Sequence, residues 1–407
     1  MEDASTNVEM YPLRVAYDGQ AFLSANGGTG KGLQLRNLLG PYADRFVGLA
    51  TPGKNYSRHP LVQGGFRGHQ LWQQFSLPRL LGAMEVEYFL APYNVAPLAL
   101  PKTTKLILVL HDLILLEPFG APTIRQRLNN GFRRFLIPRA VLRAHTILTV
   151  SEYTKRQIEE RFGVKSVHVI PCTISKSWFI ERNAIRAADK DDYILSILGN
   201  APHKNWQRAL EGYARFVSRS NHAKAVRLRV VGLSEVEREV YKRAVALGVS
   251  ELVDLEPYIT EEELQKLYRR ARAVLVPSLM EGFGIPVLEA MASGTPVISS
   301  ETTSLPEVGG EAAQYFSPVD TDEMGCALAR VFGDRELQDR MIDVGLAQAR
   351  RFHPDVVGRQ VRQFWEHLAE VHGGIREDKP AIHVPQTASH NRHHAEVDSK
   401  STPALSA

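Results

Sequence analysis

Short apolar runs alternate with helix-like segments along most of the chain. The runs at 105–110 and 273–277 are apolar at nearly every position, which is typical of parallel strands that are covered on both faces. The segment 285–292 has a proline near its first position and Gly294 beyond its end, as a helix of this kind commonly does. The alternation predicts an α/β protein built on parallel sheets.

The same pattern predicts most of the elements. Strands are expected at 13–17, 87–92, 105–110, 146–151, 167–171, 193–198, 228–232, 273–277 and 295–300. Helices are expected at about 33–39, from 152, from 261, at 285–292, between 318 and 351, and at 356–371. Residues 45–80 are less regular, and they suit a lid or acceptor-binding region as well as plain surface loops.

The chain is long enough for two domains. The strands fall into two series on either side of a polar stretch at 173–190, which predicts one domain at 12–172 and another at 191–352. A helix at 353–372 follows, and the polar, patternless residues 376–407 are expected to be disordered.

Composition narrows the class of protein. Hydrophobic content of 44% and charged content of 23% are ordinary for a soluble globular protein. Two cysteines make no disulfide framework, which fits a reducing cytosol. The first residues lack the features of a secretory signal, and no apolar run is long enough to cross a bilayer.

Positive charge is concentrated in the first half. Residues 1–172 carry 20 Lys and Arg against 12 Asp and Glu, a net +8, whereas residues 173–407 carry 29 against 33, a net −4. The segment 123–143 mixes apolar residues with Arg125, Arg127, Arg133, Arg134, Arg139 and Arg143. Such a segment suits an anionic membrane surface, and equally a solvated charged face over a core-facing stripe. If it docks on a membrane, charge reversal at Arg133 and Arg134 should abolish binding to anionic liposomes.

The strand at 273–277, the turn at 278–284 and the helix at 285–292 form the outline of an anion site. A helix start offers free N–H groups and the positive end of a dipole, and Gly282 and Gly284 let a phosphate approach the backbone. Glu281 and Glu289 suit hydroxyl groups instead, because carboxylates accept hydrogen bonds. The pattern indicates a sugar nucleotide, with Glu281 on the sugar and Glu289 on the ribose.

Glu281 and Glu289, separated by seven residues within Pro-Ser-Leu-Met-Glu-Gly-Phe-Gly-Ile-Pro-Val-Leu-Glu-Ala-Met-Ala, resemble the E-x7-E signature of retaining GT-B glycosyltransferases of family 4. The segment 304–308 resembles what usually follows this signature. The resemblance covers roughly 12–372. It implies two Rossmann-like domains facing across a cleft, with a C-terminal helix that crosses back to the first domain. The first domain would bind the acceptor and the second the nucleotide-sugar, with no metal or other cofactor.

The resemblance also assigns roles to other residues. His111 would contact the donor sugar, Lys204 and Asn205 would serve the donor phosphates, and the amides of Gly282, Phe283 and Gly284 would help Lys204 to stabilise the departing diphosphate. Asn200 and His203 stand where arginines are common, so a protonated His203 or Lys31 would have to add positive charge. Tyr258 is a candidate for packing on the nucleobase, or a core residue.

The glycine-rich loop that contains Gly28, Gly30 and Gly32 has several possible interpretations. It departs from a Walker A loop because Ala25 replaces the first glycine and Gly32 follows Lys31. By resemblance, its glycines frame the donor diphosphate or the acceptor. A tight turn that needs glycine for backbone reasons is the alternative.

The implied activity is retaining, metal-independent glycosyl transfer. The best expectation is mannose from GDP-mannose, moved to a glycan or lipid-linked saccharide in surface polysaccharide biosynthesis at the inner face of the cytoplasmic membrane. UDP- or dTDP-sugar transferases, a GT-B nucleotide-sugar 2-epimerase and a non-catalytic nucleotide-sugar binder remain open. The D-x-D spacings at 189–191 and 320–322 lack a strand setting and are expected to be coincidental.

Overall fold

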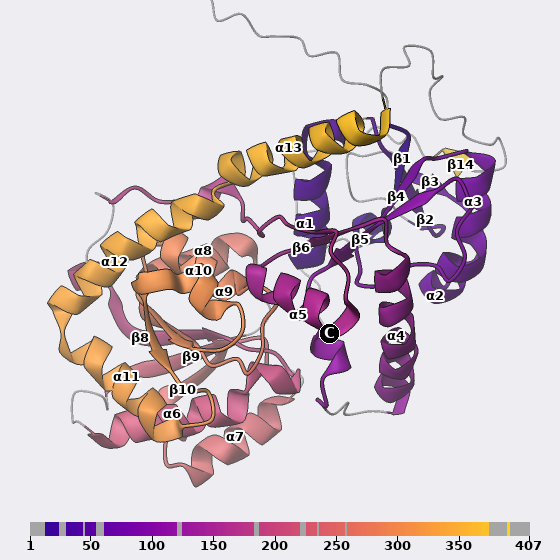
Figure 1. The fold of residues 1–407 in the computed structure, drawn as a ribbon. Coiled ribbons are helices and arrows are strands. Elements are labelled where there is room, and N and C mark those ends of the chain that lie inside the picture. Colours follow the sequence, from indigo (N-terminus) through magenta and orange to yellow (C-terminus); the bar gives the residue numbers. More distant parts are fainter. Residues whose placement is uncertain are drawn as a thin grey trace, which may run out of the picture.

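The computed structural model describes residues 13–23, 30–43, 45–53, 61–119, 124–182, 187–219, 225–233, 236–256, 259–373 and 389–390. They form two α/β domains, each built on its own sheet (Figure 1). This confirms the predicted GT-B-like arrangement of two Rossmann-like domains.

The first sheet has the strand order β14-β3-β2-β1-β4-β5-β6-β7. All neighbours pair in parallel except β14 and β3. Its strands are β1 (Val15–Asp18), β2 (Val47–Ala50), β3 (Leu61–Gln63), β4 (Tyr88–Ala91), β5 (Lys105–Leu110), β6 (Thr146–Thr149), β7 (Val167–Val169) and β14 (Ser389–His390). Its helices are α1 (Gly30–Leu39), α2 (His69–Leu71), α3 (Leu77–Ala83), α4 (Ile124–Arg143) and α5 (Glu152–Phe162), with a π-helical turn at Trp72–Ser76.

The second sheet is parallel throughout, in the order β10-β9-β8-β11-β12-β13. Its strands are β8 (Asp191–Ile197), β9 (Arg227–Val231), β10 (Val253–Glu256), β11 (Ala271–Val276), β12 (Val297–Ser300) and β13 (Ala313–Phe316). Its helices are α6 (Trp206–Arg219), α7 (Glu237–Ala246), α8 (Glu261–Arg270), α9 (Ile285–Ala292), α10 (Leu305–Gly309), α11 (Thr321–Gly333) and α12 (Arg335–Ala349).

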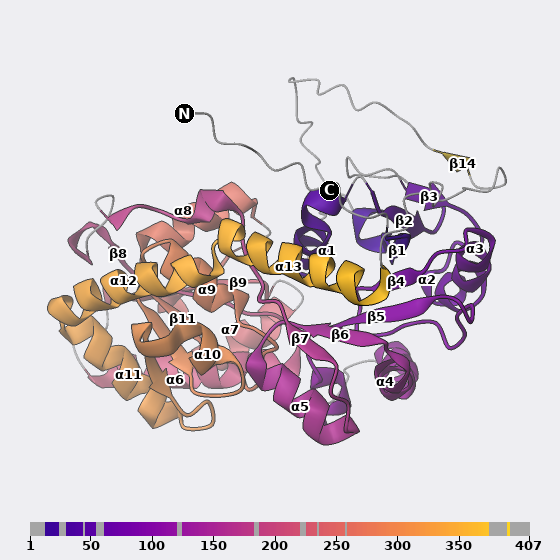
Figure 2. The same ribbon diagram turned by 45° about the horizontal axis from the view of Figure 1, so that its top comes forward.

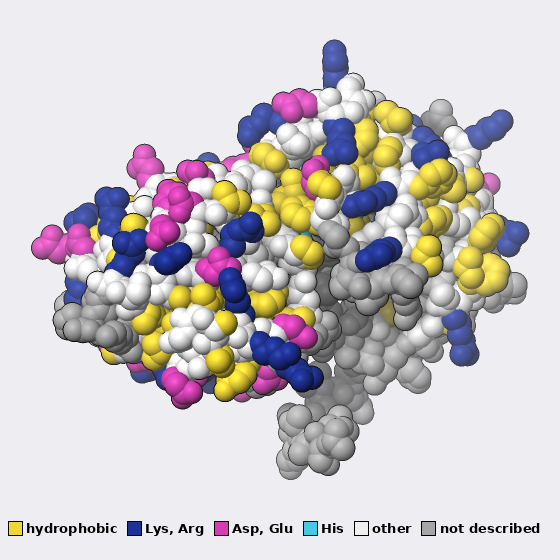
Figure 3. Space-filling view, turned by 90° about the horizontal axis from the view of Figure 1, so that it is seen from below, with side chains coloured by type: hydrophobic (Ala, Val, Ile, Leu, Met, Phe, Trp, Pro, Cys, Tyr) yellow, Lys and Arg dark blue, Asp and Glu magenta, His cyan; other side chains and the backbone are white. Residues whose placement is uncertain are grey.

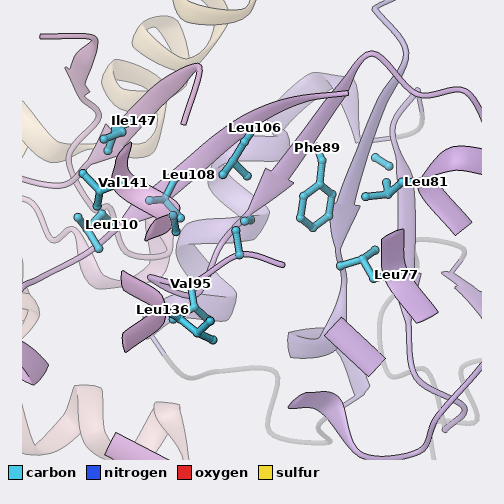
Figure 4. Close-up of a cluster of buried hydrophobic side chains, with 14 of the residues drawn as sticks. Leu77, Leu81, Phe89, Val95, Leu106, Leu108, Leu110, Leu136, Val141 and Ile147 are labelled. Carbon is cyan, nitrogen blue, oxygen red and sulfur yellow. The ribbon is translucent and has the colours of Figure 1, made fainter. Parts of the chain in front are cut away.

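Strand β5 shows why the first sheet is covered on both faces. Leu106, Leu108 and Leu110 point into a core beneath α3, α4 and α5 (Figure 4). Ile107 and Val109 point into the opposite core, beneath α1. Successive strand residues alternate between faces, so this strand, which is apolar at every position after Lys105, needs a helical layer on each side.

The last long helix, α13 (Pro354–Gly373), crosses from the second domain to the first (Figure 2). Its Val357, Val361, Trp365 and Leu368 complete the first domain's core over α1. The indole of Trp365 is 1% exposed and donates a hydrogen bond to the Leu38 carbonyl at 2.8 Å. The crossing helix implied by the resemblance is therefore present.

The connection between the domains is less polar than its sequence indicates. Ile174 and Trp178 are each 2% exposed and belong to the core of the second domain. Burial lowers the pKa of Lys190 to about 7, although Asp189 acts in the opposite direction, and its Nζ donates to the Arg269 carbonyl and Thr295 Oγ1. The predicted polar linker is thus wrong in part: much of it packs on the second domain.

The C-terminal residues 376–407, expected to be disordered, lie outside the described residues apart from β14. Residues 45–80 supply β2, β3, α2, the π-helical turn and α3. Neither β2 nor β3 was predicted.

Candidate functional site

The loop between β11 and α9 is the centre of the candidate site. Gly284 is the N-cap of α9, with φ +112°, and Pro286 lies in the first turn of the helix. The predicted strand, turn and helix are therefore confirmed. Ser304 holds the loop from below, donating hydrogen bonds to the carbonyls of Glu281 and Phe283 at 3.0 and 2.9 Å. Within the described part of the chain, the backbone N–H groups of Gly282, Phe283 and Gly284 donate to no acceptor. Three free amides at a helix start form an anion-binding arrangement.

Thr303 also supports this loop, and sequence reasoning missed it. Its Oγ1 accepts the N–H of Glu281 at 3.0 Å. Its φ is +58°, a left-handed conformation that costs free energy in a β-branched residue. Strain of this kind persists where the surroundings impose it, often at functional sites.

Lys204 and Glu281 form an ion pair at the mouth of the loop. Lys204 Nζ lies 2.7 Å from Glu281 Oε1, and Ser278 Oγ donates to the same oxygen at 2.7 Å. The two side chains are 24% and 12% exposed, so both are accessible and partly shielded from water. A diphosphate that binds Lys204 would compete with Glu281 and release the carboxylate to accept hydroxyl groups.

Asn205 positions its neighbours. Its side chain is 2% exposed, and its amide nitrogen donates to the Pro277 and Pro318 carbonyls at 2.9 and 2.8 Å. Its backbone has φ +60°, which ends the turn that presents Lys204. Both hydrogens of this amide are already used in hydrogen bonds within the protein. A direct hydrogen bond from the amide to a nucleotide-sugar would require one of these two hydrogen bonds to break.

Glu289 lies deeper, where α9 meets α8. Its Oε2 accepts a hydrogen bond from the hydroxyl of the fully buried Tyr268 at 2.7 Å. Burial raises the pKa of Glu289 to about 7, and Glu261 adds to the rise, while the Tyr268 hydrogen bond and Lys204 oppose it. A carboxylate with this pKa changes charge near neutral pH.

His111 follows β5 and lies against the same loop from the first domain. Its Nε2 donates to the Pro92 carbonyl at 2.9 Å, and its backbone N–H donates to Asn94 Oδ1 at 2.8 Å. A Cβ built on Gly282 would lie 2.1 Å from the His111 carbonyl oxygen. The structure therefore brings His111 and Gly282, two separately predicted site residues, into contact, and only glycine fits there.

Helix α5 also reaches across to the second domain. Ser151, its N-cap, accepts the N–H of Thr154 and donates to the Gly282 carbonyl at 2.7 Å. Glu307 accepts the N–H groups of Glu152 and Tyr153 at 2.9 and 3.1 Å. A carboxylate at a helix N-terminus is favourable, so the two domains are joined beside the loop.

The surroundings of His203 work against a positive charge on its imidazole. Burial lowers its pKa, with a further lowering from Lys204, although Glu281 and Asp112 oppose the shift. The imidazole is thus held toward its neutral form at neutral pH. Its backbone carbonyl accepts the N–H of Leu279 at 2.7 Å, which fixes the start of the loop.

The other expected site residues differ in how their positions compare with the sequence prediction. Gly30 is the first residue of α1 and Gly32 lies in its first turn, so the loop predicted around them is wrong at these two positions. Gly28 and Tyr258 lie outside the described residues. The Phe283 side chain is 5% exposed and packs edge-on against Phe352, which leaves its backbone as the part that faces a ligand.

The two D-x-D spacings have structural roles. Asp320 caps α11 through the N–H groups of Asp322 and Glu323. Asp191 forms a two-bond ion pair with Arg270 at the surface, with both distances 2.6 Å. Among the described residues, no group of three or more His, Cys, Asp or Glu side chains is placed to hold a metal ion.

Comparisons with known proteins follow the same division of the chain. Residues 179–347 match the model for glycosyl transferases group 1 and residues 42–178 match the model for glycosyltransferase family 4. The chain belongs to the family 4 glycosyltransferases.

Two mannosyltransferases are among the relatives of this family 4 member. It is 34% identical over 210 residues to the MMP alpha-(1->4)-mannosyltransferase of Mycolicibacterium hassiacum, covering 50% of this chain and 49% of that one. It is 30% identical over 226 residues to the O-antigen chain mannosyltransferase RfbU of Salmonella typhimurium, covering 55% and 60%. The chain thus spans about half to three fifths of the length of these relatives.

A solved structure of the same fold is the sucrose-phosphate synthase of Thermosynechococcus elongatus. The superposition has a TM-score of 0.68 at 16% identity, covering 88% of this chain and 99% of the other. At this identity the likeness establishes the fold.

Proposed function

We propose that this family 4 member is a retaining glycosyltransferase that moves mannose from GDP-mannose to a glycan or lipid-linked saccharide in surface polysaccharide biosynthesis. The observation that carries the proposal is the 2.7 Å ion pair of Lys204 and Glu281. It lies beside the backbone amides of residues 282–284, which donate to no acceptor among the residues that the structure describes. The names of the mannosyltransferase relatives support mannose as the sugar. GDP is the proposed carrier.

In this proposal the donor diphosphate lies on the amides of residues 282–284 and on Lys204. The bond between the anomeric carbon and the phosphate oxygen breaks, and negative charge grows on the diphosphate, which these fixed donors stabilise. An acceptor hydroxyl forms the new bond on the same face, and its proton passes to the departing phosphate oxygen. Glu281 accepts sugar hydroxyls and Glu289 accepts the ribose hydroxyls.

His111 contributes through its backbone. Its carbonyl lies against Gly282, so it faces the point where the donor sugar would meet the loop. Its imidazole is 8% exposed and is fixed by Pro92. This fixed position holds the donor sugar between the two domains, which is the kind of positioning that raises the rate of a two-substrate reaction.

Two measurements test the proposal. Thermal shifts with GDP, UDP, dTDP and ADP, each with magnesium and with EDTA, should show stabilisation by GDP in both conditions, because a ligand of the native state raises its melting temperature. Incubation with GDP-mannose should then release GDP, and NMR of the product should show the α-configuration retained. A free epimerised sugar nucleotide would establish the epimerase instead, and nucleotide binding without release would establish a binding protein.

Peripheral membrane contact through α4 is part of the same proposal. None of the helices in the described ranges is long and apolar enough to cross a bilayer. The outer face of α4 exposes Leu128, Phe135 and Leu142 at 71%, 46% and 64%. Hydrophobic side chains interspersed with Lys and Arg are visible on the side of the first domain in Figure 3. Apolar groups among basic ones suit an anionic lipid surface.

The hydrogen bonds of Arg133 and Arg134 make charge reversal at these residues a poor test of the membrane contact. Arg133 donates to the Tyr93 carbonyl and Arg134 to the Leu115 and Glu117 carbonyls, so charge reversal there would also disturb the fold. The double variant Leu128→Glu with Phe135→Glu should abolish flotation with anionic liposomes. Val344→Glu, at an exposed valine of α12, is the matched control. Unchanged flotation of the double variant would refute the membrane contact.

A further inference from the structure

A cavity of about 360 Å³ lies beside the two segments that connect the domains. The cores to which residues belong show where the chain crosses. At the first crossing, Ile170 belongs to the core of the first domain and Cys172 to that of the second. At the other crossing, Phe352 belongs to the core of the second domain and Val357 to that of the first. Each crossing is therefore only a few residues long, as hinge segments commonly are.

The walls of this cavity come from the connections and from the body of the second domain. His353 and Val356 lie at the start of α13, and the segment 176–181 follows the first crossing. The ends of α9 and α12 supply Ala292 and Leu346. Figure 2 shows α12 leading into α13 where the crossing begins. A molecule bound here would contact the second domain and the segment that leaves it at the same time.

Polar contacts already tie the two connections to each other. Thr173 Oγ1 donates a hydrogen bond to the Phe352 carbonyl at 2.6 Å. Lys176 Nζ lies 2.7 Å from Asp355 Oδ1. A ligand that shifts one connection therefore acts on the other as well.

The inner part of the cavity is apolar. Ile180 and Leu346 belong to one small hydrophobic cluster, and Leu346 is 8% exposed. The ring of Phe179 meets that of His353 edge-on at 4.7 Å. The N–H of Ile180 is already used on the Ala292 carbonyl at 3.1 Å, so this wall offers a ligand side chains rather than that backbone group. A short hydrocarbon chain suits such a wall, and the volume lies in the lower part of the range for small-molecule sites.

Basic side chains outnumber acidic ones among the described residues that line the cavity. Lys176, Arg350 and His353 stand there with Glu181. Arg350 and Glu181 are 3.4 Å apart, with side chains 65% and 86% exposed, and an ion pair this exposed is weak. Arg350 can therefore exchange Glu181 for a ligand. Positive groups beside an apolar wall select an anion that carries a hydrocarbon chain.

His353 offers a further donor to such an anion. Its Nδ1 accepts the N–H of Asp355 at 3.3 Å, so the proton of the neutral ring lies on Nε2. Within the described part of the chain, Nε2 has no hydrogen-bond partner. The imidazole can thus donate to a carboxylate or a phosphate without losing an existing bond.

The domain arrangement that encloses this cavity is also the one that shapes the donor loop. Ser151 and His111 of the first domain both contact Gly282. Helix α9 follows that loop, and its last residue, Ala292, is part of the cavity wall. A ligand shifts a protein toward the arrangement that it binds better. A ligand that fits the cavity should therefore favour the arrangement in which the donor loop is complete.

We propose that this cavity is an allosteric site for a small amphiphilic anion, with its head group on Arg350 and His353 and its hydrocarbon chain against Ile180 and Leu346. The head group is a carboxylate or a phosphate. Occupation of the site strengthens nucleotide binding at the donor loop. The anion site goes beyond the proposed transfer reaction, and only its coupling to GDP rests on the proposed function.

The first test is calorimetric titration of the full-length protein, without nucleotide, with octanoate and with octyl phosphate. At least one should bind, and the tighter of the two identifies the head group. Octanamide, which lacks the charge, and inorganic phosphate, which lacks the chain, should each bind at least tenfold more weakly. Affinity should fall at least tenfold in Arg350→Gln, which removes a head-group contact, and in Val356→Trp, which fills the cavity. Arg351→Gln is the matched control, because this neighbouring arginine is exposed and hydrogen-bonded to Gln348.

The second test measures the affinity for GDP with and without the octyl compound that binds. Saturation with that compound should raise GDP affinity about fivefold or more, the lower end for allosteric coupling. Saturation with GDP should raise the affinity for the octyl compound by the same factor, because coupling between two binding sites is reciprocal. Arg350→Gln should keep the GDP affinity of the wild type and lose the increase at octyl concentrations that saturate the wild type.

The anion site is overturned if neither octyl anion binds, or if affinity is unchanged in both Arg350→Gln and Val356→Trp. Anion binding that leaves GDP affinity unchanged overturns the allosteric role. A protein that binds an octyl anion here but does not bind GDP would refute the proposed donor and support the anion site. The coupling would then be measured with whichever nucleotide raises the melting temperature.

Discussion

Ser151 in the first domain donates a hydrogen bond to the carbonyl of Gly282 in the second, with 2.7 Å between the two oxygens. The carbonyl is thereby turned toward α5, and the N–H side of the loop is left for a ligand. On its other flank, Gly282 touches the carbonyl of His111. The loop that would hold the donor is thus shaped by both domains together.

Gly282→Ala should lower turnover by about 10²-fold, because a methyl group 2.1 Å from the His111 carbonyl must push the domains apart and misplace the reacting groups. The measurement is kcat with GDP-mannose, alongside the melting temperature. Gly333→Ala is the control, since a Cβ there would meet nothing within 4 Å. Equal kcat in the two variants would contradict the close approach.

Lys204→Ala and Glu281→Ala should each reduce turnover by about 10²-fold or more, as expected for loss of a main electrostatic contact. Their effects on GDP affinity should differ. Lys204→Ala weakens GDP binding, whereas Glu281→Ala preserves or strengthens it because Lys204 loses its internal partner. Calorimetric titration with GDP measures this, and Lys266→Ala, from an exposed pair, is the control. Weaker GDP binding in Glu281→Ala would contradict the competition.

Glu289 should make GDP binding depend on pH. Its pKa is about 7 in the free protein, so it is mostly neutral at pH 6 and mostly charged at pH 8. If the carboxylate accepts the ribose hydroxyls, affinity rises about tenfold over this range, following the ionised fraction. Because the folded-state pKa lies above the usual value, the same group's contribution to the stability of the free protein falls as pH rises through 7.

Glu289→Gln is the matched test, since it removes the ionisation and keeps the shape. The variant should show a flat GDP affinity between pH 6 and pH 8. A slope equal to that of the wild type would assign the pH dependence to another group.

Two substitutions of Thr303 should separate the effect of its backbone strain on stability from the effect of its hydrogen bond. Thr303→Val keeps the β-branched side chain at φ +58° and loses the bond to the Glu281 N–H, so the melting temperature should fall by several degrees. Thr303→Gly loses the same bond but relieves roughly 1–3 kcal/mol of backbone strain, so it should melt higher than the valine variant. Both should lose turnover. A glycine variant less stable than the valine variant would show that the conformation is unstrained.

The local parts of this protein were readable from sequence and the long-range parts were not. The strand at 105–110, the helix at 285–292 and the Ser151 cap follow from periodicity and from residues a few positions apart. Gly30 was misplaced because a glycine-rich stretch reads as a turn, while here the helix already begins at Gly30. Local patterns cannot show when tertiary packing overrides propensity.

The candidate site shows the same limit. The sequence assigned Glu281 to the donor sugar, and the resemblance assigned Lys204 to the donor phosphates. Their mutual ion pair was not predicted, because it joins residues 77 positions apart. Asn205 was grouped with Lys204, although its amide faces inward. The cap that Glu307 forms on α5 had no local signal, because it depends on how distant segments pack. The positive φ of Thr303 has no local sequence signal either.

The position of Trp365 has a consequence for how the protein is made. The first domain's core includes Tyr17 near one end of the sequence and Trp365 and Leu368 near the other. During synthesis, the first domain therefore cannot complete its core until the entire second domain has been translated. Part of its apolar surface stays uncovered until then. Domains generally fold as units in the order in which they emerge, but here the second domain can complete its own sheet before the core of the first domain is complete. The ribosome thus releases the second domain nearly finished, and the core of the first domain is completed last.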